Sequence, residues 1–256
     1  METLIIFGRA PGVGSARNKL ARELGEVEAE RLYAAFLSDA AATAASWRRR
    51  AVAGQPRQVA LYVPDSADDA LVVETAATCS ARICVHSGTE LVEQMAHAVQ
   101  DELDRGAERV FLLSSSAPTL PVHLLEEALR AVLYHDVVVG PGFDGGCWGL
   151  GLRRDPDARP EREAGLREAL FQKIAWGTPG SLGQAMERLH KAGFTLHMLP
   201  FWLDVTDPAD LSRLKLNLRY QELRGSPAGA ATRMALSLHA GPPVPSAAPL
   251  RGARRA

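Results

Sequence analysis

The stretch from residue 4 to residue 20 reads LIIFGRAPGVGSARNKL and contains the signals that decide the fold. Its first four residues form a continuous apolar run that ends at Gly8, which is typical of a short buried strand. Apolar side chains then recur at helical spacing between Ala29 and Leu37. This part of the sequence therefore predicts a strand, a glycine-rich loop and a helix.

The same alternation continues along the chain. We expect strands near residues 58–63, 82–85, 109–113, 136–140 and 194–199, and helices near residues 67–77, 91–103, 122–133 and 181–191. Alternating elements indicate an α/β fold with a mainly parallel sheet and helices on both faces. In such a sheet, ligands bind in the loops outside the carboxyl ends of the strands.

Length and composition limit the possibilities further. A chain of 256 residues is long enough for one sizeable domain, which we place at residues 1–224, followed by a flexible tail rich in Pro, Ala and Arg at residues 225–256. The formal net charge of -1 favours neither nucleic acid nor a membrane as a partner. Three cysteines are too few for a disulfide framework, and the first residues form no signal peptide or membrane span, so we expect a cytoplasmic protein.

The loop after the first strand combines glycines with cations. Gly12 and Gly14 allow a ligand to approach the backbone closely, and Arg9, Arg17 and Lys19 add positive charge, which together suit a phosphate group. The spacing matches neither the Walker loop nor the dinucleotide-binding fingerprint, because no Gly-Lys-Ser/Thr and no third glycine follow where they are due. A plain turn with solvated charges is the alternative interpretation.

Two later loops also follow predicted strands and carry polar groups. The three serines at residues 114–116 can donate to phosphate or sugar oxygens, although serines in a turn before a helix are also common caps. Asp144 lies among glycines, including Gly145 and Gly146, where a carboxylate can meet a sugar hydroxyl or a metal. An ordinary Asp-Gly turn is an equally good interpretation.

The last polar segments precede the predicted end of the domain. Asp207 and Pro208 are expected as the N-cap and first residue of a helix. Asp204 is then the carboxylate that remains available to bind a ligand or to act in catalysis. Trp176 suits both packing and the wall of a pocket, and Thr178 lies two residues after it.

Taken in order, these segments resemble a known family. Gly8–Pro11 and Arg17–Leu20 match its first loop, Glu90–Met95 its Asp-Leu-Gly-x-Arg-Met segment, Gly140–Cys147 its Gly-Pro-x-x-Asp-Gly-Gly-Tyr segment, and Trp176–Pro179 its Trp-x-Thr-Pro segment. The chain is therefore similar to the small bacterial glycosyltransferase-A-like family of the radical-SAM/selenodomain-associated transferase type, a relative of the cofactor guanylyltransferases. The resemblance implies a fold of the nucleotide-diphospho-sugar transferase (GT-A) type.

Two departures from the family pattern concern a metal site. Ser116 stands in the turn at residues 114–120 where the family has the aspartate that is expected to hold a metal and the nucleotide diphosphate. The family's Asp-Val-Asp-Thr-Pro segment corresponds to residues 204–208, which keep Asp204 and lose the second carboxylate at its usual place. We therefore expect Mg²⁺ or Mn²⁺ to be weakly bound or absent, with Asp204 as the ligand if a metal binds.

The function that the resemblance implies is transfer of a sugar from a nucleotide diphosphate-sugar to a small-molecule acceptor. The resemblance assigns catalysis to Asp144 and Asp204, and it assigns phosphate binding to the first loop together with Ser116. The substrate pocket would include Gly145, Gly146, Trp176 and Thr178. Two alternatives stay open: nucleotidyl transfer of the guanylyltransferase kind, and a non-catalytic module that binds a nucleotide or a partner.

Overall fold

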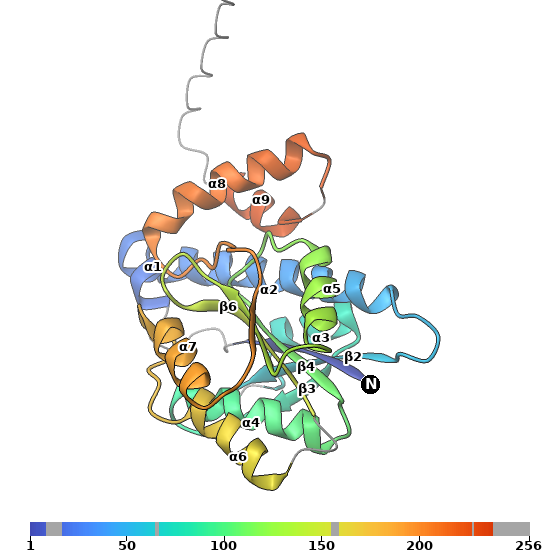
Figure 1. Cartoon of the computed structure of the whole chain (residues 1–256). Helices are drawn as coiled ribbons and strands as arrows, with labels where there is room; N and C mark the ends of the chain where they lie inside the picture. Colours follow the sequence, from blue (N-terminus) through green and yellow to red (C-terminus); the bar gives the residue numbers. More distant parts are fainter. Residues whose placement is uncertain (9–16, 65–66, 155–158, 227, 238–256) are drawn as a thin grey trace, which may run out of the picture.

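The computed structural model describes residues 1–8, 17–64, 67–154, 159–226 and 228–237, and Figure 1 shows their arrangement. One sheet contains the seven strands β1 (Glu2–Phe7), β2 (Arg57–Val63), β3 (Arg82–Val85), β4 (Arg109–Ser114), β5 (Val137–Pro141), β6 (Cys147–Arg153) and β7 (Leu196–Met198). The strand order is β3-β2-β1-β4-β6-β5-β7, and only β6 runs antiparallel to its neighbours among these strands. The predicted α/β fold with a mainly parallel sheet is confirmed.

Helices cover both faces of the sheet, as the alternating pattern predicts (Figure 1). One face packs against α2 (Glu26–Arg49), α3 (Ala70–Cys79) and α5 (Val122–Ala131). The other face packs against α4 (Leu91–Asp104), α6 (Pro160–Phe171) and α7 (Ser181–Lys191). None of the described helices is both long enough and apolar enough to cross a membrane.

A third apolar cluster joins the beginning of the chain to its last described helices. It contains side chains of α1 (Arg17–Leu24), α2, α8 (Pro208–Leu223) and α9 (Ala230–Ser237). Figure 1 shows α8 and α9 lying next to each other at one end of the molecule. This cluster brings the N-terminus of α8 close to α1, at the end of the first loop.

Strand β6 was not among the predicted strands, because its sequence CWGLGLR carries glycines where a strand normally has side chains. A Cβ atom at Gly149 would lie 2.4 Å from Cζ of Phe111 on the neighbouring strand β4. A Cβ atom at Gly151 would lie 2.8 Å from a methyl carbon of Val132. These glycines therefore make room for the buried Phe111 ring, a tertiary requirement that has no periodic signal in the sequence.

Helix α9 corrects the expected tail at residues 225–256. Residues 230–237 form a helix on α2, where the buried Asp39 accepts hydrogen bonds from the backbone N–H groups of Ala231 at 3.0 Å and Thr232 at 2.8 Å. The prediction is wrong for this segment because its Ala- and Gly-rich composition hides good helix formers and because its partner lies 193 residues away. The rest of the expected tail, residues 238–256, lies outside the described residues.

Buried ion pairs hold the amino ends of the central strands. The carboxylate of Glu2 on β1 contacts Nε of Arg57 on β2 at 3.0 Å and Nη1 of Arg109 on β4 at 3.1 Å. Arg57 also pairs with Glu126 of α5 at 2.6 Å. The charges of these buried side chains are therefore compensated at the amino ends of the strands. The loops that could carry function follow the carboxyl ends of the strands, on the opposite side of the sheet.

Candidate functional site

The candidate site lies at the carboxyl edge of the sheet, where β1, β4 and β5 end. Phe7 of β1 pairs with Ser114 of β4, so the loops that follow these two strands begin side by side. Strand β6 begins at the same edge, because Cys147 pairs with Pro141 at the end of β5. The polar segments that follow β1, β4 and β5 therefore begin at this edge.

The first loop contributes its last part. Its residues 9–16, including Arg9, Gly12 and Gly14, lie outside the described residues, and their role in phosphate binding stays a prediction. Arg17 begins helix α1, and Lys19 follows on the same helix with 60% of its side chain exposed.

Lys19 is paired with the end of another helix. Its Nζ lies 3.5 Å from Oδ2 of Asp207, and Oδ1 of Asp207 accepts the backbone N–H of Ala209 at 3.0 Å. The bond from Ala209 and the nearby lysine hold the pKa of Asp207 below its usual value. Asp207 is thus the N-cap of α8 with Pro208 next to it, as the sequence predicts, and Lys19 is held next to this cap.

Ser114 links two loops of the site. Its Oγ donates to Oδ1 of Asp204 at 2.8 Å and accepts the backbone N–H of Ser116 at 3.1 Å. The carbonyl oxygen of Ser116 in turn accepts the backbone N–H of Val205 at 2.8 Å. The loop after β4 therefore fixes the segment that carries Asp204, and Ser116 takes part through its backbone.

Asp144 is fixed in the loop between β5 and β6. Its Oδ1 accepts the backbone N–H of Gly146 at 2.9 Å, and its Oδ2 accepts the hydroxyl of Thr206 at 3.4 Å. Gly145 has φ +84°, and a Cβ atom there would lie 2.8 Å from the backbone nitrogen of Gly180. Glycine is therefore required at residue 145 both for its conformation and for the close approach of the turn before α7.

Cys147 shows that the two carboxylates share one environment. Burial raises the pKa of its thiol to about 12, and the negative charges of Asp204 and Asp144 both act in the same direction. The hydrogen bond from Thr206, two residues after Asp204, to Asp144 joins the two loops directly.

Trp176 and Thr178 lie in the turn before α7, which packs against the loop between β5 and β6. The ring of Trp176 is buried in the core on the α4 side, and its Nε1 donates to the carbonyl of Leu170 at 2.8 Å. The hydroxyl of Thr178 is bound to the carbonyl of Ala175 at 2.7 Å. Both side chains stabilise the turn, and their assignment to the substrate pocket stays a prediction that these contacts do not support.

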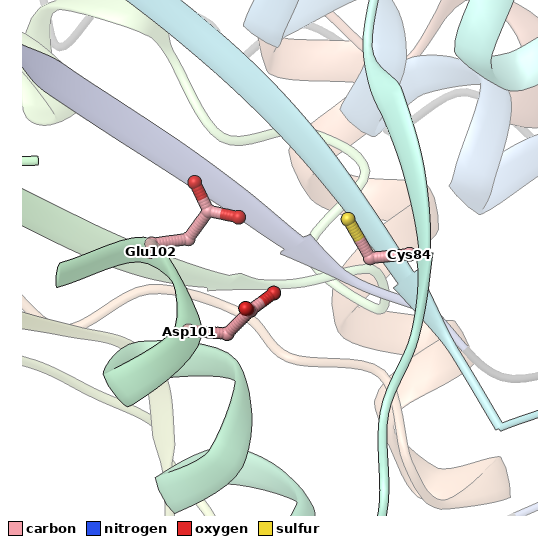
Figure 2. Close-up of side chains that lie close together, drawn as sticks. All are labelled: Cys84, Asp101 and Glu102. Carbon is pink, nitrogen blue, oxygen red and sulfur yellow. The ribbon is translucent and has the colours of Figure 1, made fainter. Parts of the chain in front are cut away.

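Residues of the types that bind metal ions come together away from this edge of the sheet. Within the described part of the chain, the ligand atoms of three such residues lie within 4.8 Å of one another only at Cys84, Asp101 and Glu102, which Figure 2 shows between β3 and α4. Nη2 of Arg82 binds both carboxylate oxygens of Glu102, at 2.7 and 2.8 Å, and the hydroxyl of Tyr62 lies within hydrogen-bond distance of both acids, at 2.5 Å from Asp101 and 2.8 Å from Glu102. Because a guanidinium already neutralises Glu102, this cluster is a hydrogen-bonded network unsuited to a cation.

Sequence reasoning missed Cys147 and Thr206 as members of the site and the linking role of Ser114. A serine after a strand and a threonine before a helix have common local uses, so their types carry no signal of a long-range bond. The order of the sequence segments indicated the carboxylates Asp144 and Asp204, but not the side chains that bind them.

One family model and several solved structures match this chain. The family model described as "Uncharacterized protein conserved in bacteria (DUF2064)" matches residues 44–178. A crystal structure of a candidate nucleotide-diphospho-sugar transferase from Desulfovibrio desulfuricans G20 matches with a TM-score of 0.73 and 26% identity, covering 93% of this chain and 96% of that chain. No curated protein matches the sequence.

More distant structures share the fold. A nucleotidyl transfer enzyme from Methanothermobacter has a TM-score of 0.54 at 12% identity, covering 86% of this chain and 99% of its own. The 4-diphosphocytidyl-2C-methyl-D-erythritol synthase of Anaerococcus prevotii DSM 20548 has a TM-score of 0.53 at 11% identity, covering 85% and 96%. The expected fold of the nucleotide-diphospho-sugar transferase type is thereby confirmed, and the chain belongs to the DUF2064 family of bacterial proteins.

Proposed function

We propose that this protein is a transferase that binds a nucleotide diphosphate-sugar at the carboxyl edge of its sheet and passes the sugar to a small acceptor. The observation that carries the proposal is the contact between the two loops that hold Asp144 and Asp204, far apart in the sequence, through the 3.4 Å hydrogen bond from Thr206 to Asp144. Carboxylates at this edge are placed where ligands of open α/β sheets bind. The similarity to the Desulfovibrio protein, at 26% identity over nearly the whole chain, supports the same class of substrate.

The phosphates belong to the cationic side of the site. Lys19 lies in the first turn of α1, which begins at Arg17, and the loop before this helix carries Arg9. Negative charge builds on the diphosphate as the sugar–phosphate bond breaks, and fixed cations near it stabilise that charge. Nucleotide binding therefore depends on this loop and on the first turn of α1.

The acceptor belongs to the acidic side. A hydroxyl of the acceptor donates to the carboxylate of Asp144 or Asp204, which takes the proton as the acceptor oxygen bonds to the sugar carbon. The bond from that carbon to the diphosphate breaks in the same step, and the nucleoside diphosphate leaves with the electron pair. Ser114 and Thr206 hold the two carboxylates in place through their hydroxyls.

The proposal assigns the charge of the diphosphate to Arg9, Arg17 and Lys19. A serine hydroxyl stands at residue 116, so a divalent metal at this site would have Asp144, Asp204 and the phosphates of the nucleotide as its ligands.

The test is a product assay. The protein is incubated with a panel of sugar nucleotides and, separately, of nucleoside triphosphates, each with mixed small acceptors. Release of nucleoside diphosphate from a sugar nucleotide is expected, and Asp144→Asn and Asp204→Asn should each lower its rate by about a hundredfold or more. Asp104→Asn changes an exposed carboxylate of α4 and is the matched control.

Nucleotidyl transfer is the second candidate, because the Methanothermobacter and Anaerococcus proteins share the fold. In that reaction an acceptor phosphate attacks the triphosphate and diphosphate leaves. Release of inorganic diphosphate from a triphosphate, with sugar nucleotides left intact, would replace the first proposal by this one. Nucleotide binding with no turnover of either class would indicate a non-catalytic module.

A further inference from the structure

Two phenylalanine rings are exposed beside the acidic half of the candidate site. Phe143 is 61% exposed and Phe201 is 53% exposed, and their ring centroids lie 5.7 Å apart with an interplanar angle of 29°. Single exposed apolar residues are common on protein surfaces, whereas a stacked aromatic pair at the edge of a polar site is typical of a ligand-binding surface.

The backbone holds this pair in place. Phe143 follows Gly142 and Phe201 precedes Trp202, and these two neighbours form a parallel β-bridge. The backbone N–H of Trp202 donates to the carbonyl of Pro141 at 3.1 Å, and the N–H of Gly142 donates to the carbonyl of Gly146 at 3.0 Å. The rings therefore project from two clamped segments, and their stacking needs no rearrangement before a ligand arrives.

The pair is continuous with the carboxylates. Phe143 is the residue directly before Asp144, and Phe201 lies three residues before Asp204. Asp144 and Asp204 are thus the carboxylates on the same two clamped segments that carry the rings. The surface thus offers an apolar face without donors next to groups that accept hydrogen bonds from hydroxyls.

We infer that Phe143 and Phe201 form the acceptor subsite, and that the acceptor is a cyclic polyol, a sugar or cyclitol ring, with its C–H face on the aromatic pair and its hydroxyls toward Asp144 and Asp204. This inference rests on the proposed function, which supplies the donor sugar but leaves the acceptor open. A flat ring face fits an aromatic surface, whereas an open-chain polyol presents no such face and must lose conformational freedom to adopt one.

Direct binding to the whole protein tests the subsite without turnover. Methyl α-D-glucopyranoside is the cyclic probe, and erythritol is an acyclic polyol with the same number of hydroxyl groups. Saturation-transfer NMR with irradiation of the aromatic protons should give a signal on the C–H protons of the cyclic probe and none on erythritol. Phe143→Leu and Phe201→Leu should each weaken binding of the cyclic probe about tenfold, since leucine keeps apolar bulk but removes the ring face.

Tyr134→Leu is the matched control, because Tyr134 is an aromatic residue that is 75% exposed after α5. This variant should leave the signal of the cyclic probe unchanged. An equal signal from both probes, or an unchanged signal in the double Phe143→Leu/Phe201→Leu variant, would overturn the inference. So would failure of the cyclic probe to bind the unmodified protein.

Nucleotide titration separates this result from the proposed function. A protein that binds and turns over a sugar nucleotide, yet shows no ring-dependent probe signal, keeps the proposed function and loses the acceptor subsite. A protein that binds no nucleotide loses the proposed function, whatever the probe signal.

Discussion

The hydroxyl of Ser114 lies 2.8 Å from Oδ1 of Asp204, and the two residues are separated by 90 positions in the chain. Because the same oxygen accepts the N–H of Ser116, its own proton is directed at the carboxylate. The pair therefore connects the end of β4 to the loop before α8 and fixes the orientation of an acid that we assign to catalysis. Ser114 acts through Asp204 and is a positioning residue.

Replacing Ser114 should lower the catalytic rate more than substrate binding. Ser114→Ala removes the bond to Asp204, so kcat should fall about tenfold with KM for the sugar nucleotide nearly unchanged, and the free energy of unfolding should fall by about 1 kcal/mol. Steady-state kinetics and urea unfolding measure the two effects. Ser114→Thr, which keeps the hydroxyl, should restore most of kcat. Ser237→Ala, which removes a hydroxyl bond within α9, is the control, and an equal loss of kcat there would contradict a positioning role.

Lys19 should matter for nucleotide affinity and little for stability. Lys19→Ala removes a charge that we assign to the phosphates, so affinity for a nucleoside diphosphate should fall roughly tenfold, because a charge-assisted contact contributes about 1.5–3 kcal/mol. The loss of its exposed pair with Asp207 should change stability by less than about 1 kcal/mol. Lys191→Ala breaks another exposed lysine pair, with Glu187, and is the matched control. Calorimetry that finds the same affinity for both variants would remove Lys19 from the phosphate site.

Metal should have little effect on nucleotide binding. In the natural protein, the affinity for a nucleoside diphosphate in excess Mg²⁺ or Mn²⁺ should differ less than a hundredfold from that in chelator, which corresponds to about 2.7 kcal/mol. Ser116→Asp should create a metal dependence, because the backbone at residue 116 is bonded to the segment that carries Asp204. Ser237→Asp adds the same charge on α9 and should create none. A hundredfold or larger metal effect in the natural protein would show that its carboxylates already hold a cation.

Helix α9 should be required for full stability. A chain that ends at residue 224 leaves Asp39 without the backbone donors of Ala231 and Thr232, so its free energy of unfolding should fall by about 2–4 kcal/mol. A chain that ends at residue 237 keeps these bonds and should match the full-length protein. Thermal and urea unfolding of the three chains distinguish them. Equal stability of the two shortened chains would contradict a structural role for α9.

Asp136 should make stability depend on pH in the acid range. Burial by itself would raise the pKa of this carboxyl, but hydrogen bonds from Thr195 and the ion pair with Arg162 outweigh it and hold the pKa below its usual value. The folded state therefore binds the proton less tightly than the unfolded state. The stabilisation is complete above the unfolded pKa of about 3.9 and is lost as the pH falls through the lower folded value.

The corresponding measurement compares the natural protein with Asp136→Asn by urea unfolding between about pH 2 and pH 6. The stability advantage of the natural protein should be largest near pH 6 and should shrink toward pH 2. Asp104→Asn, which removes an exposed carboxylate of α4, is measured alongside for comparison. An advantage of the natural protein over Asp136→Asn that stays constant or grows in acid would be inconsistent with the bonds at Asp136.

Local sequence patterns determined most of the fold. The apolar run at residues 4–7 and its repetition at later strands predict a buried parallel sheet, because strands covered on both faces need continuous apolar sequence. Asp207 and Pro208 likewise predict the start of α8, because capping uses only neighbouring backbone groups. Signals of this kind depend on residues within one turn or one strand, so they can be recognised from the sequence alone.

Tertiary structure alone decided the antiparallel strand β6, the packing of α9 on Asp39 and the bond between Ser114 and Asp204. Each of these joins residues whose types have ordinary local uses, and each depends on space or on a partner that only the folded chain supplies. Gly149 is needed because the ring of Phe111 occupies the place of a side chain. The sequence by itself determined that two carboxylates follow strands of an α/β sheet, and the three-dimensional fold decided which hydroxyls hold them and which exposed rings lie beside them.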